Sequence, residues 1–355
     1  MRHLLRSSLA AWLVVAVALV AGDFPSDQSL AERRAVIDLI ATKLEASYVS
    51  ASVAAEMAAM LRPRSAGGGY DHGSLAELAD QLTADLRQIS RDGHLRVRHH
   101  SDPAQVMPAW NQPAPDAEAR YREHARRTNF GFARVEILPG NVGYLRLDEF
   151  GDPALGGDTA AAVMRFVANT DTLIIDLREN GGGGGMGSVL ASYLFEGPNI
   201  HLSNFEIRGR GETLQLWTAP YVPGPRYTRP VFLLTGPGTA SAAESFAYML
   251  HNRKRVTLVG GKTAGAANPG GYVRLSEHLA VFVPDGRPVD PLTGTNWEGV
   301  GIPPDIESDV AAALNLAHVR ALEGLVAAAN GDAAKSAPWN EALALLLSRR
   351  EQPAR

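Results

Sequence analysis

Ser241 stands where a serine hydroxyl could act as a nucleophile. It follows the apolar segment 231–236 (VFLLTG) and precedes residues 242–252 (AAESFAYMLHN), whose apolar spacing is helical. A serine at such a junction meets free N–H groups and the positive end of the helix dipole, which stabilise a developing anion. The N–H of Ala242 would be a natural oxyanion donor. From this segment alone, Ser241 could equally be an ordinary helix N-cap.

Five consecutive glycines, Gly181–Gly185, form a second segment that could take part in chemistry. They follow a strand-like apolar run at 172–175 and the polar residues 176–180 (DLREN). A glycine run after a strand exposes backbone N–H groups, as an anion nest does. It lacks the closing Lys-Ser/Thr of a phosphate loop and the spacing of a dinucleotide loop. We therefore favour an oxyanion loop over a phosphate site, with a flexible turn as the alternative.

Two further segments supply candidate partners for a serine. His94 ends the segment 92–94 (DGH), and a neutral histidine is the usual base for a serine nucleophile. His99 and His100 are close by, but their spacing matches no helical ligand pair and no cysteine or carboxylate joins them, so we expect no metal site. Glu298 lies in a Gly- and Pro-rich loop, where it could orient a histidine or be a surface carboxylate.

The elements that must position these residues divide the chain. Residues 27–90 have helical apolar spacing, with Ser74 and Glu77 spaced as a capping box before the third helix. A short strand is expected at 94–99. From residue 129 strands and helices alternate, which predicts an α/β core. The expected strands lie at 130–138, 141–147, 172–178, 231–236, 255–260 and 278–284, and the expected helices at 158–169, 186–195, 242–252, 309–328 and 339–350.

Composition and the N-terminus limit the class of protein. The formal net charge is -4 and no basic stripe occurs, which argues against a nucleic-acid partner. The chain has no cysteine, which excludes disulfides, thiol chemistry and a lipid anchor on cysteine. A basic start and the short apolar run 9–21 predict a cleaved signal peptide and no stable membrane anchor. We therefore expect a periplasmic or secreted protein.

These observations predict the following organisation: a signal peptide at 1–22, an N-terminal helical subdomain at 23–100, a connecting segment at 101–128, a catalytic α/β core at 129–328, and a C-terminal helix and tail at 329–355.

Six segments, in this order, together resemble the tail-specific (C-terminal-processing) serine protease superfamily. They lie at 82–97, 129–147, 176–183 (DLRENGGG), 239–250 (TASAAESFAYML), 259–271 (VGGKTAGAANPGG) and 290–306 (DPLTGTNWEGVGIPPDI). The resemblance covers roughly residues 75–325. It is nearest to the branch of the interphotoreceptor retinoid-binding protein modules and the tricorn protease core.

The resemblance implies a ββα-superhelix core of the crotonase and Clp-protease type and a peptidase that needs no cofactor. Ser241 matches the nucleophile, His94 the base and Glu298 the acidic member of a triad that forms an acyl-enzyme on a peptide or protein substrate. Ala242 and the pair Gly182-Gly183 match the oxyanion donors.

The sequence also departs from the superfamily. The lysine of the Ser–Lys dyad is replaced by Ala266, although Lys262 is close by, and Asn268 stands where many relatives have histidine. No segment resembles a PDZ domain. A different class of function therefore stays open: a non-catalytic module that binds retinoid-like or fatty-acid ligands, or a scaffold that binds peptides. The oligomeric state is not determined by these patterns.

Overall fold

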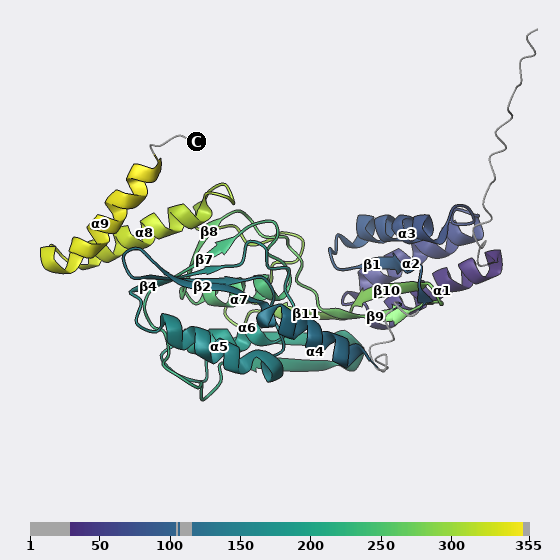
Figure 1. The fold of residues 1–355 in the computed structure, drawn as a ribbon. Helices are drawn as coiled ribbons and strands as arrows, with labels where there is room; N and C mark the ends of the chain where they lie inside the picture. Colours follow the sequence, from purple (N-terminus) through teal and green to yellow (C-terminus); the bar gives the residue numbers. More distant parts are fainter. Residues whose placement is uncertain (1–28, 104–105, 107–115, 351–355) are drawn as a thin grey trace, which may run out of the picture.

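The computed structural model describes residues 29–103, 106 and 116–350. Figure 1 shows an α/β core with a smaller helical unit at one end and a pair of C-terminal helices at the other. The predicted signal peptide at 1–22 lies outside the described residues. Within the described part of the chain, no helix is long and apolar enough to cross a membrane.

The bounds of the elements follow chain order. The helices are α1 (Leu30–Ser47), α2 (Ala51–Ala66), α3 (Leu75–Ser90), α4 (Ala117–Arg127), α5 (Pro153–Val167), α6 (Met186–Tyr193), α7 (Ala242–Asn252), α8 (Ala313–Ala328) and α9 (Ala333–Arg350). The strands are β1 (Arg96–His99), β2 (Phe132–Leu138), β3 (Val142–Leu147), β4 (Thr172–Asp176), β5 (His201–Ile207), β6 (Glu212–Trp217), β7 (Val231–Thr235), β8 (Thr257–Gly260), β9 (Gly270–Arg274), β10 (Leu279–Pro284), β11 (Gly286–Val289) and β12 (Ile306–Glu307). Two short 3-10 helices lie at Asn129–Gly131 and Arg208–Arg210.

The core is a six-stranded sheet in the order β12-β8-β7-β4-β3-β2, parallel except for the antiparallel β2. Alternate residues of its strands point to opposite faces. On β4, Leu173 and Ile175 join the cluster formed with α5, α6 and α7, whereas Ile174 joins the cluster formed with α8 and α9. Because both faces are covered by helices, β4 and β7 carry apolar residues on both faces.

The N-terminal unit is larger than the predicted helical subdomain. Helices α1–α3 pack on a three-stranded sheet in the order β1-β10-β9. Leu279, Val281 and Val283 of β10 are buried among the side chains of these helices. The sequence predicted this strand within the 129–328 core, because an apolar run does not show which sheet it joins. The other domain boundaries stay predictions.

Two further features differ from the sequence expectations. The connecting segment contains α4, a strongly charged helix with one buried residue, Ala125. A third sheet, in the order β11-β5-β6, was not predicted. Its strand β6 is almost entirely exposed, so its residues lack the burial pattern that identifies a strand from sequence.

We predict that residues 29–100 do not fold alone. This fragment lacks β10, whose three buried apolar side chains complete the N-terminal core, so its helices would expose an unpaired apolar face. Circular dichroism and thermal melting of the fragment should show no cooperative transition. The same fragment joined by a glycine-serine linker to residues 270–284 should melt cooperatively, and equal behaviour of both would contradict the prediction.

Candidate active site

The site lies at the carboxyl edge of the parallel sheet. Strands β4 and β7 are neighbours and run in the same direction, so the loops that follow them leave the sheet side by side. The loop after β4 carries the glycine run, and the loop after β7 leads to Ser241. The Ala240 N–H donates to the Asn180 carbonyl at 3.0 Å and joins the two loops directly. The juxtaposition follows from strand order alone.

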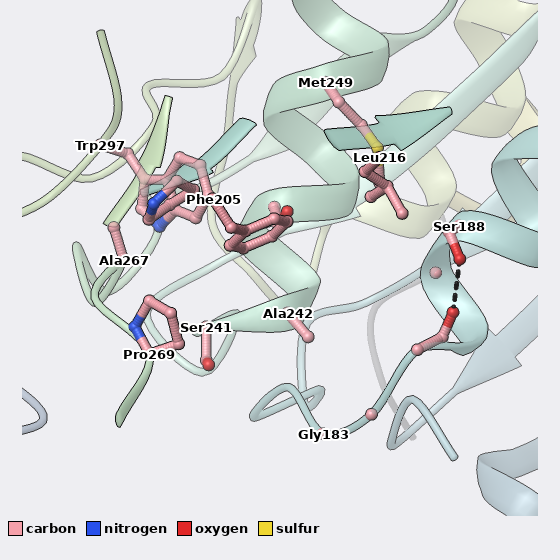
Figure 2. Close-up of a pocket in the computed structure, with 15 residues that line it drawn as sticks. Gly183, Ser188, Phe205, Leu216, Ser241, Ala242, Met249, Ala267, Pro269 and Trp297 are labelled. Carbon is pink, nitrogen blue, oxygen red and sulfur yellow. Dashed lines mark hydrogen bonds between the residues drawn. The ribbon is translucent and has the colours of Figure 1, made fainter. Parts of the chain in front are cut away.

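Ser241 has a backbone conformation that an ordinary N-cap does not have. Its φ is 54° and its ψ is -118°, whereas N-cap residues usually lie in the extended region. A non-glycine residue with such angles costs on the order of 1–3 kcal/mol and persists only where surrounding contacts hold it. Figure 2 shows its hydroxyl directed away from α7, beside Pro269 and the glycine loop. The structure thus presents the hydroxyl at a helix N-terminus.

The contacts that hold this backbone come from Glu244, which is fully buried. Its carboxylate accepts the Ser241 N–H at 3.0 Å, and also the N–H groups of Gly265 at 2.7 Å and Ala266 at 2.9 Å and the hydroxyl of Thr263 at 2.5 Å. Burial raises the pKa of Glu244, and these hydrogen bonds oppose the rise. Glu244 was not among the residues predicted to form the site. The spacing Ser241-x-x-Glu244, which is that of a capping box, is the signal that could have identified it.

The glycine loop lies directly against Ser241. A side-chain carbon added at Gly182 would lie 2.8 Å from the Ser241 Cβ and 2.9 Å from the Ala242 nitrogen, so only glycine fits there. Gly182 and Gly183 both have positive φ, 109° and 126°. The resemblance implied that Gly182 and Gly183 lie at the oxyanion site, and the structure has both residues in the loop beside Ser241.

The backbone donors of this loop are not equivalent. The Gly182 N–H donates to the Asn180 Oδ1 at 2.9 Å and is therefore already engaged. Within the described residues, no hydrogen-bond partner is found for the N–H groups of Gly183 and Ala242. Of the three oxyanion donors expected from sequence, Gly183 and Ala242 are available, and Gly182 instead provides the space that Ser241 needs.

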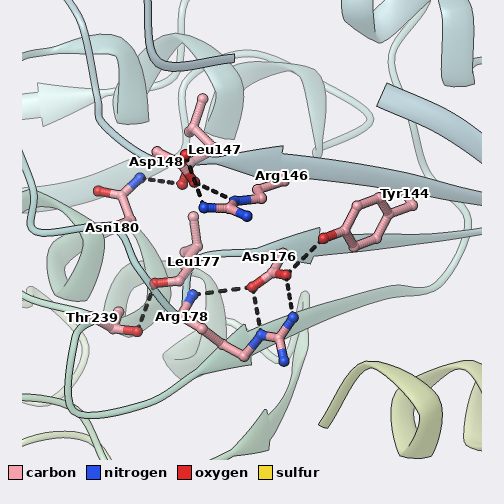
Figure 3. A network of polar contacts seen from close by, with 9 residues as sticks. All are labelled: Tyr144, Arg146, Leu147, Asp148, Asp176, Leu177, Arg178, Asn180 and Thr239. Carbon is pink, nitrogen blue, oxygen red and sulfur yellow. Dashed lines mark hydrogen bonds and ion pairs between the residues drawn. The ribbon is translucent and has the colours of Figure 1, made fainter. Parts of the chain in front are cut away.

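Hydrogen bonds within the described residues hold the segment 176–180, which precedes the glycine loop, as Figure 3 shows. Asp176 accepts hydrogen bonds from Arg178, at 2.7 and 2.9 Å, and from the Tyr144 hydroxyl at 2.7 Å. Burial acts to raise the pKa of Asp176, but these bonds outweigh it and the pKa is lowered. Asn180 Nδ2 donates to the Leu147 carbonyl at 2.8 Å. The polar residues of this motif therefore fix the loop rather than face the site.

His94 lies with Asp92 and Glu298 in a cluster at the junction of the N-terminal unit and the core. One ligand-type atom from each of the three lies within 4.8 Å of the others. The His94 Nδ1 and the Glu298 Oε1 are both buried and without a hydrogen-bond partner. The structure thus brings together two of the residues that the sequence singled out, each with one free atom.

Asp92 and Asn268 connect this cluster to the core. Asp92, which is 1% exposed, accepts the His94 N–H at 2.9 Å and the Asn268 side-chain amide at 3.1 Å. The Glu298 Oε2 accepts the N–H groups of Ala267 at 2.6 Å and Asn268 at 3.0 Å. The loop 263–268 therefore contacts Glu244, beneath the serine, at one end and the histidine cluster at the other. No hydrogen bond joins His94 to Ser241 in the described residues.

Burial shifts the pKa values of the titratable groups in this cluster. Burial raises the pKa of Glu298 to about 7, and repulsion from Asp92 adds to the effect. Burial lowers the pKa of His94, with Asp92 opposing and Arg96 and Arg87 reinforcing the change. Near neutral pH, the imidazole is therefore neutral, which is the form required of a base.

The same three side chains are the ones within the described residues that could offer converging ligands to a cation. A hydrogen bond from the His94 Nδ1 to the Glu298 Oε1 would satisfy both unpartnered atoms without a metal. The expectation that no metal is needed stays a prediction. His99 and His100 do not join this group.

A cavity of about 250 Å³ opens beside Ser241 (Figure 2). Apart from the glycine loop and three serines, its walls are apolar. They include Phe205, Leu216, Met249, Pro269, Pro288 and Trp297. Trp297 is buried, and its ring lies 5.1 Å from that of Tyr248. The hydroxyl of Ser241 thus borders a space suited to an apolar group.

Comparison with known families agrees with this arrangement. Residues 141–308 match the profile of peptidase family S41, and residues 30–137 match that of the N-terminal domain of peptidase S41 in eukaryotic IRBP. The two matches follow each other and span most of the chain. The chain belongs to peptidase family S41, a family of serine-type peptidases.

Individual relatives match only about half of this chain. The chain is 30% identical over 181 residues to the carboxy-terminal-processing protease of Bartonella bacilliformis, a match that covers 49% of this chain and 39% of that protein. It is 30% identical over 183 residues to the chloroplastic carboxyl-terminal-processing peptidase 1 of Arabidopsis thaliana, a match that covers 51% of this chain and 36% of that protein. The matches therefore span less than half of the length of these relatives.

Solved structures show the fold. Mature CPAF is similar with a TM-score of 0.56 and 13% identity, covering 85% of this chain and 99% of that one. A peptidase from Parabacteroides merdae, described as putative, has a TM-score of 0.51 and 19% identity, covering 80% of this chain and 90% of that one. The tricorn protease has a TM-score of 0.50 and 14% identity, covering 80% of this chain and 35% of that one. At these identities the similarity shows the fold alone, an α/β fold like that of S41 proteases with a helical N-terminal region.

We predict that Gly182→Ala lowers kcat by about 10²-fold or more, because its added carbon would displace Ser241 and a misplacement of about 1 Å has that cost. Gly181→Ala is the matched control, since a carbon added there meets nothing within 4 Å. Steady-state kinetics of both variants on one peptide substrate, with folding checked by circular dichroism, makes the comparison. Equal kcat values in two folded variants would contradict this role of Gly182.

Proposed function

We propose that this protein is a serine peptidase that uses Ser241, His94 and Glu298 as a catalytic triad. The observation that carries the proposal is the strained Ser241 backbone at the N-terminus of α7, next to two unpartnered N–H groups and an apolar cavity. Strained residues of this kind concentrate at functional sites. Membership of family S41 supports the same conclusion.

In the proposed mechanism, His94 removes the hydroxyl proton as the Ser241 Oγ attacks a peptide carbonyl. The N–H groups of Ala242 and Gly183 stabilise the oxyanion of the tetrahedral intermediate. The intermediate expels the amine, which takes the proton from His94, and leaves an acyl-enzyme that water then hydrolyses. Glu298 accepts the His94 Nδ1–H and stabilises the imidazolium. Catalytic hydrogen bonds often tighten only when substrate binds, so we expect His94 to approach Ser241 in the complex.

The cavity beside Ser241 suggests a preference for an apolar side chain next to the cleaved bond, because a charged group would be desolvated there without a partner.

We also propose a ββα-superhelix of the crotonase and Clp-protease type for the core. Export to the periplasm or exterior, after removal of residues 1–22, is part of the same proposal, and N-terminal sequencing of the mature protein tests it.

A carrier for apolar ligands is the second candidate, favoured by the apolar lining of the same cavity. A carrier has no need of a strained serine with free oxyanion donors, so the peptidase is the better account. The two differ in one reaction: a fluorophosphonate labels an activated serine covalently, whereas a carrier binds a retinoid or fatty acid reversibly without labelling.

We predict that a fluorophosphonate labels Ser241 stoichiometrically. His94→Ala should slow labelling and peptide hydrolysis by about 10⁴-fold or more, because no base remains. Lys262→Ala should retain most of both activities, since Lys262 is exposed and lies outside the cluster. Mass spectrometry of the labelled protein identifies the site. An inactive Lys262→Ala with an active His94→Ala would replace the triad with a displaced Ser–Lys dyad.

We predict that kcat/KM rises with pH through about 7. Glu298, whose pKa is raised to about 7, must lose its proton before it can accept the His94 Nδ1–H. In Glu298→Gln this titration is absent. The remaining activity should be lower by about 10⁴-fold. Its kcat/KM should rise over a lower pH range, because the lowered pKa of His94 then determines the rise. A pH profile that is unchanged in the variant would show that Glu298 is not a member of the triad.

A further inference from the structure

A second cavity lies next to the one beside Ser241. Its volume is about 300 Å³, and Phe205 and Pro269 belong to the walls of both cavities. Ser47, at the end of α1, also lines it, so this cavity lies between the N-terminal unit and the core. Nothing in the proposed mechanism uses it.

One wall of the second cavity is the edge of strand β9. Four consecutive residues, Gly270–Val273, line it. Because successive residues of a strand point to opposite faces, a cavity that meets four in a row meets the edge of the strand. In the described residues β9 pairs only with β10, so its other edge carries unpaired backbone groups. Two of the four residues are glycines, which leaves those groups open to a partner.

Another part of the wall is largely apolar and comes from the β11-β5-β6 sheet. Phe205 and Ile207 of β5 and Leu214 of β6 contribute to it, and Leu214 is 53% exposed. The charged residues at this cavity are Arg210 and Asp285, of opposite sign. Their charges offset each other, so the cavity favours an apolar group over a charged one.

We propose that this second cavity is a subsite for a second apolar side chain of an extended peptide whose backbone pairs with the free edge of β9. Strand addition to an exposed edge supplies affinity through backbone hydrogen bonds, and pockets for individual side chains supply selectivity. The shared walls place this peptide on a continuous path to Ser241. The inference rests on the proposed function in that it takes a peptide as substrate.

Binding to Ser241→Ala separates this site from catalysis. The probes are fluorescein-labelled Gly/Ser peptides of about ten residues, with one leucine fixed and a second leucine moved one position at a time. Fluorescence anisotropy should show one spacing that binds about tenfold more tightly, as expected for burial of a leucine side chain. Methylation of a single backbone nitrogen within that peptide should weaken binding, because strand pairing would lose a donor.

Leu214→Ser, added to Ser241→Ala, should abolish the preferred spacing. Ile137→Ser is the matched control, since Ile137 is 45% exposed on β2, away from both cavities, and should leave the preference intact. Affinity that does not depend on spacing, or a preference that survives Leu214→Ser, would overturn the subsite. Wild-type protein that takes no fluorophosphonate label but keeps the spacing preference would disprove the peptidase and support the subsite.

Discussion

The site depends on one buried carboxylate. Glu244 holds the Ser241 N–H with one oxygen and ties down loop 263–268 with both. A buried charge is tolerated only where hydrogen bonds replace its lost hydration, and four donors do so here. The strain in the Ser241 backbone is therefore held by contacts that would leave several buried donors unpaired if they broke. Nucleophile and loop are set by the same group, so neither can move independently.

That loop also joins the two units of the molecule. Ala266 is held by Glu244, and the next two residues are held by Glu298, with Asn268 reaching across to Asp92. The proposed base thus belongs to the N-terminal unit, whereas the nucleophile belongs to the core itself. The distance between His94 and Ser241 is therefore set by how the two units pack on each other rather than by local backbone geometry.

The parts of the site that follow from local rules could be predicted. A parallel sheet places the loops after neighbouring strands together, which is why Ser241 and the glycine run meet. The Ser74–Glu77 capping box forms as its spacing predicts. Contacts between distant segments could not be predicted. The apolar run of β10 does not show which sheet it joins, the occupied N–H of Gly182 depends on the orientation of Asn180, and Glu244 looks like a helix residue until its four donors are seen.

The path of the chain through β10 affects when the protein can fold during synthesis. After α3 and β1 the chain enters the core, returns to the N-terminal unit for β9 and β10, and leaves that unit for the β11-β5-β6 sheet after the single residue Asp285. The first helices made by a ribosome must therefore wait for residues near 284 before their apolar faces are covered. Such late closure slows folding and leaves apolar surface open to other proteins in the meantime. A chain built this way would stay open to the unfolded transport that the proposed export requires until residues near 284 have been made.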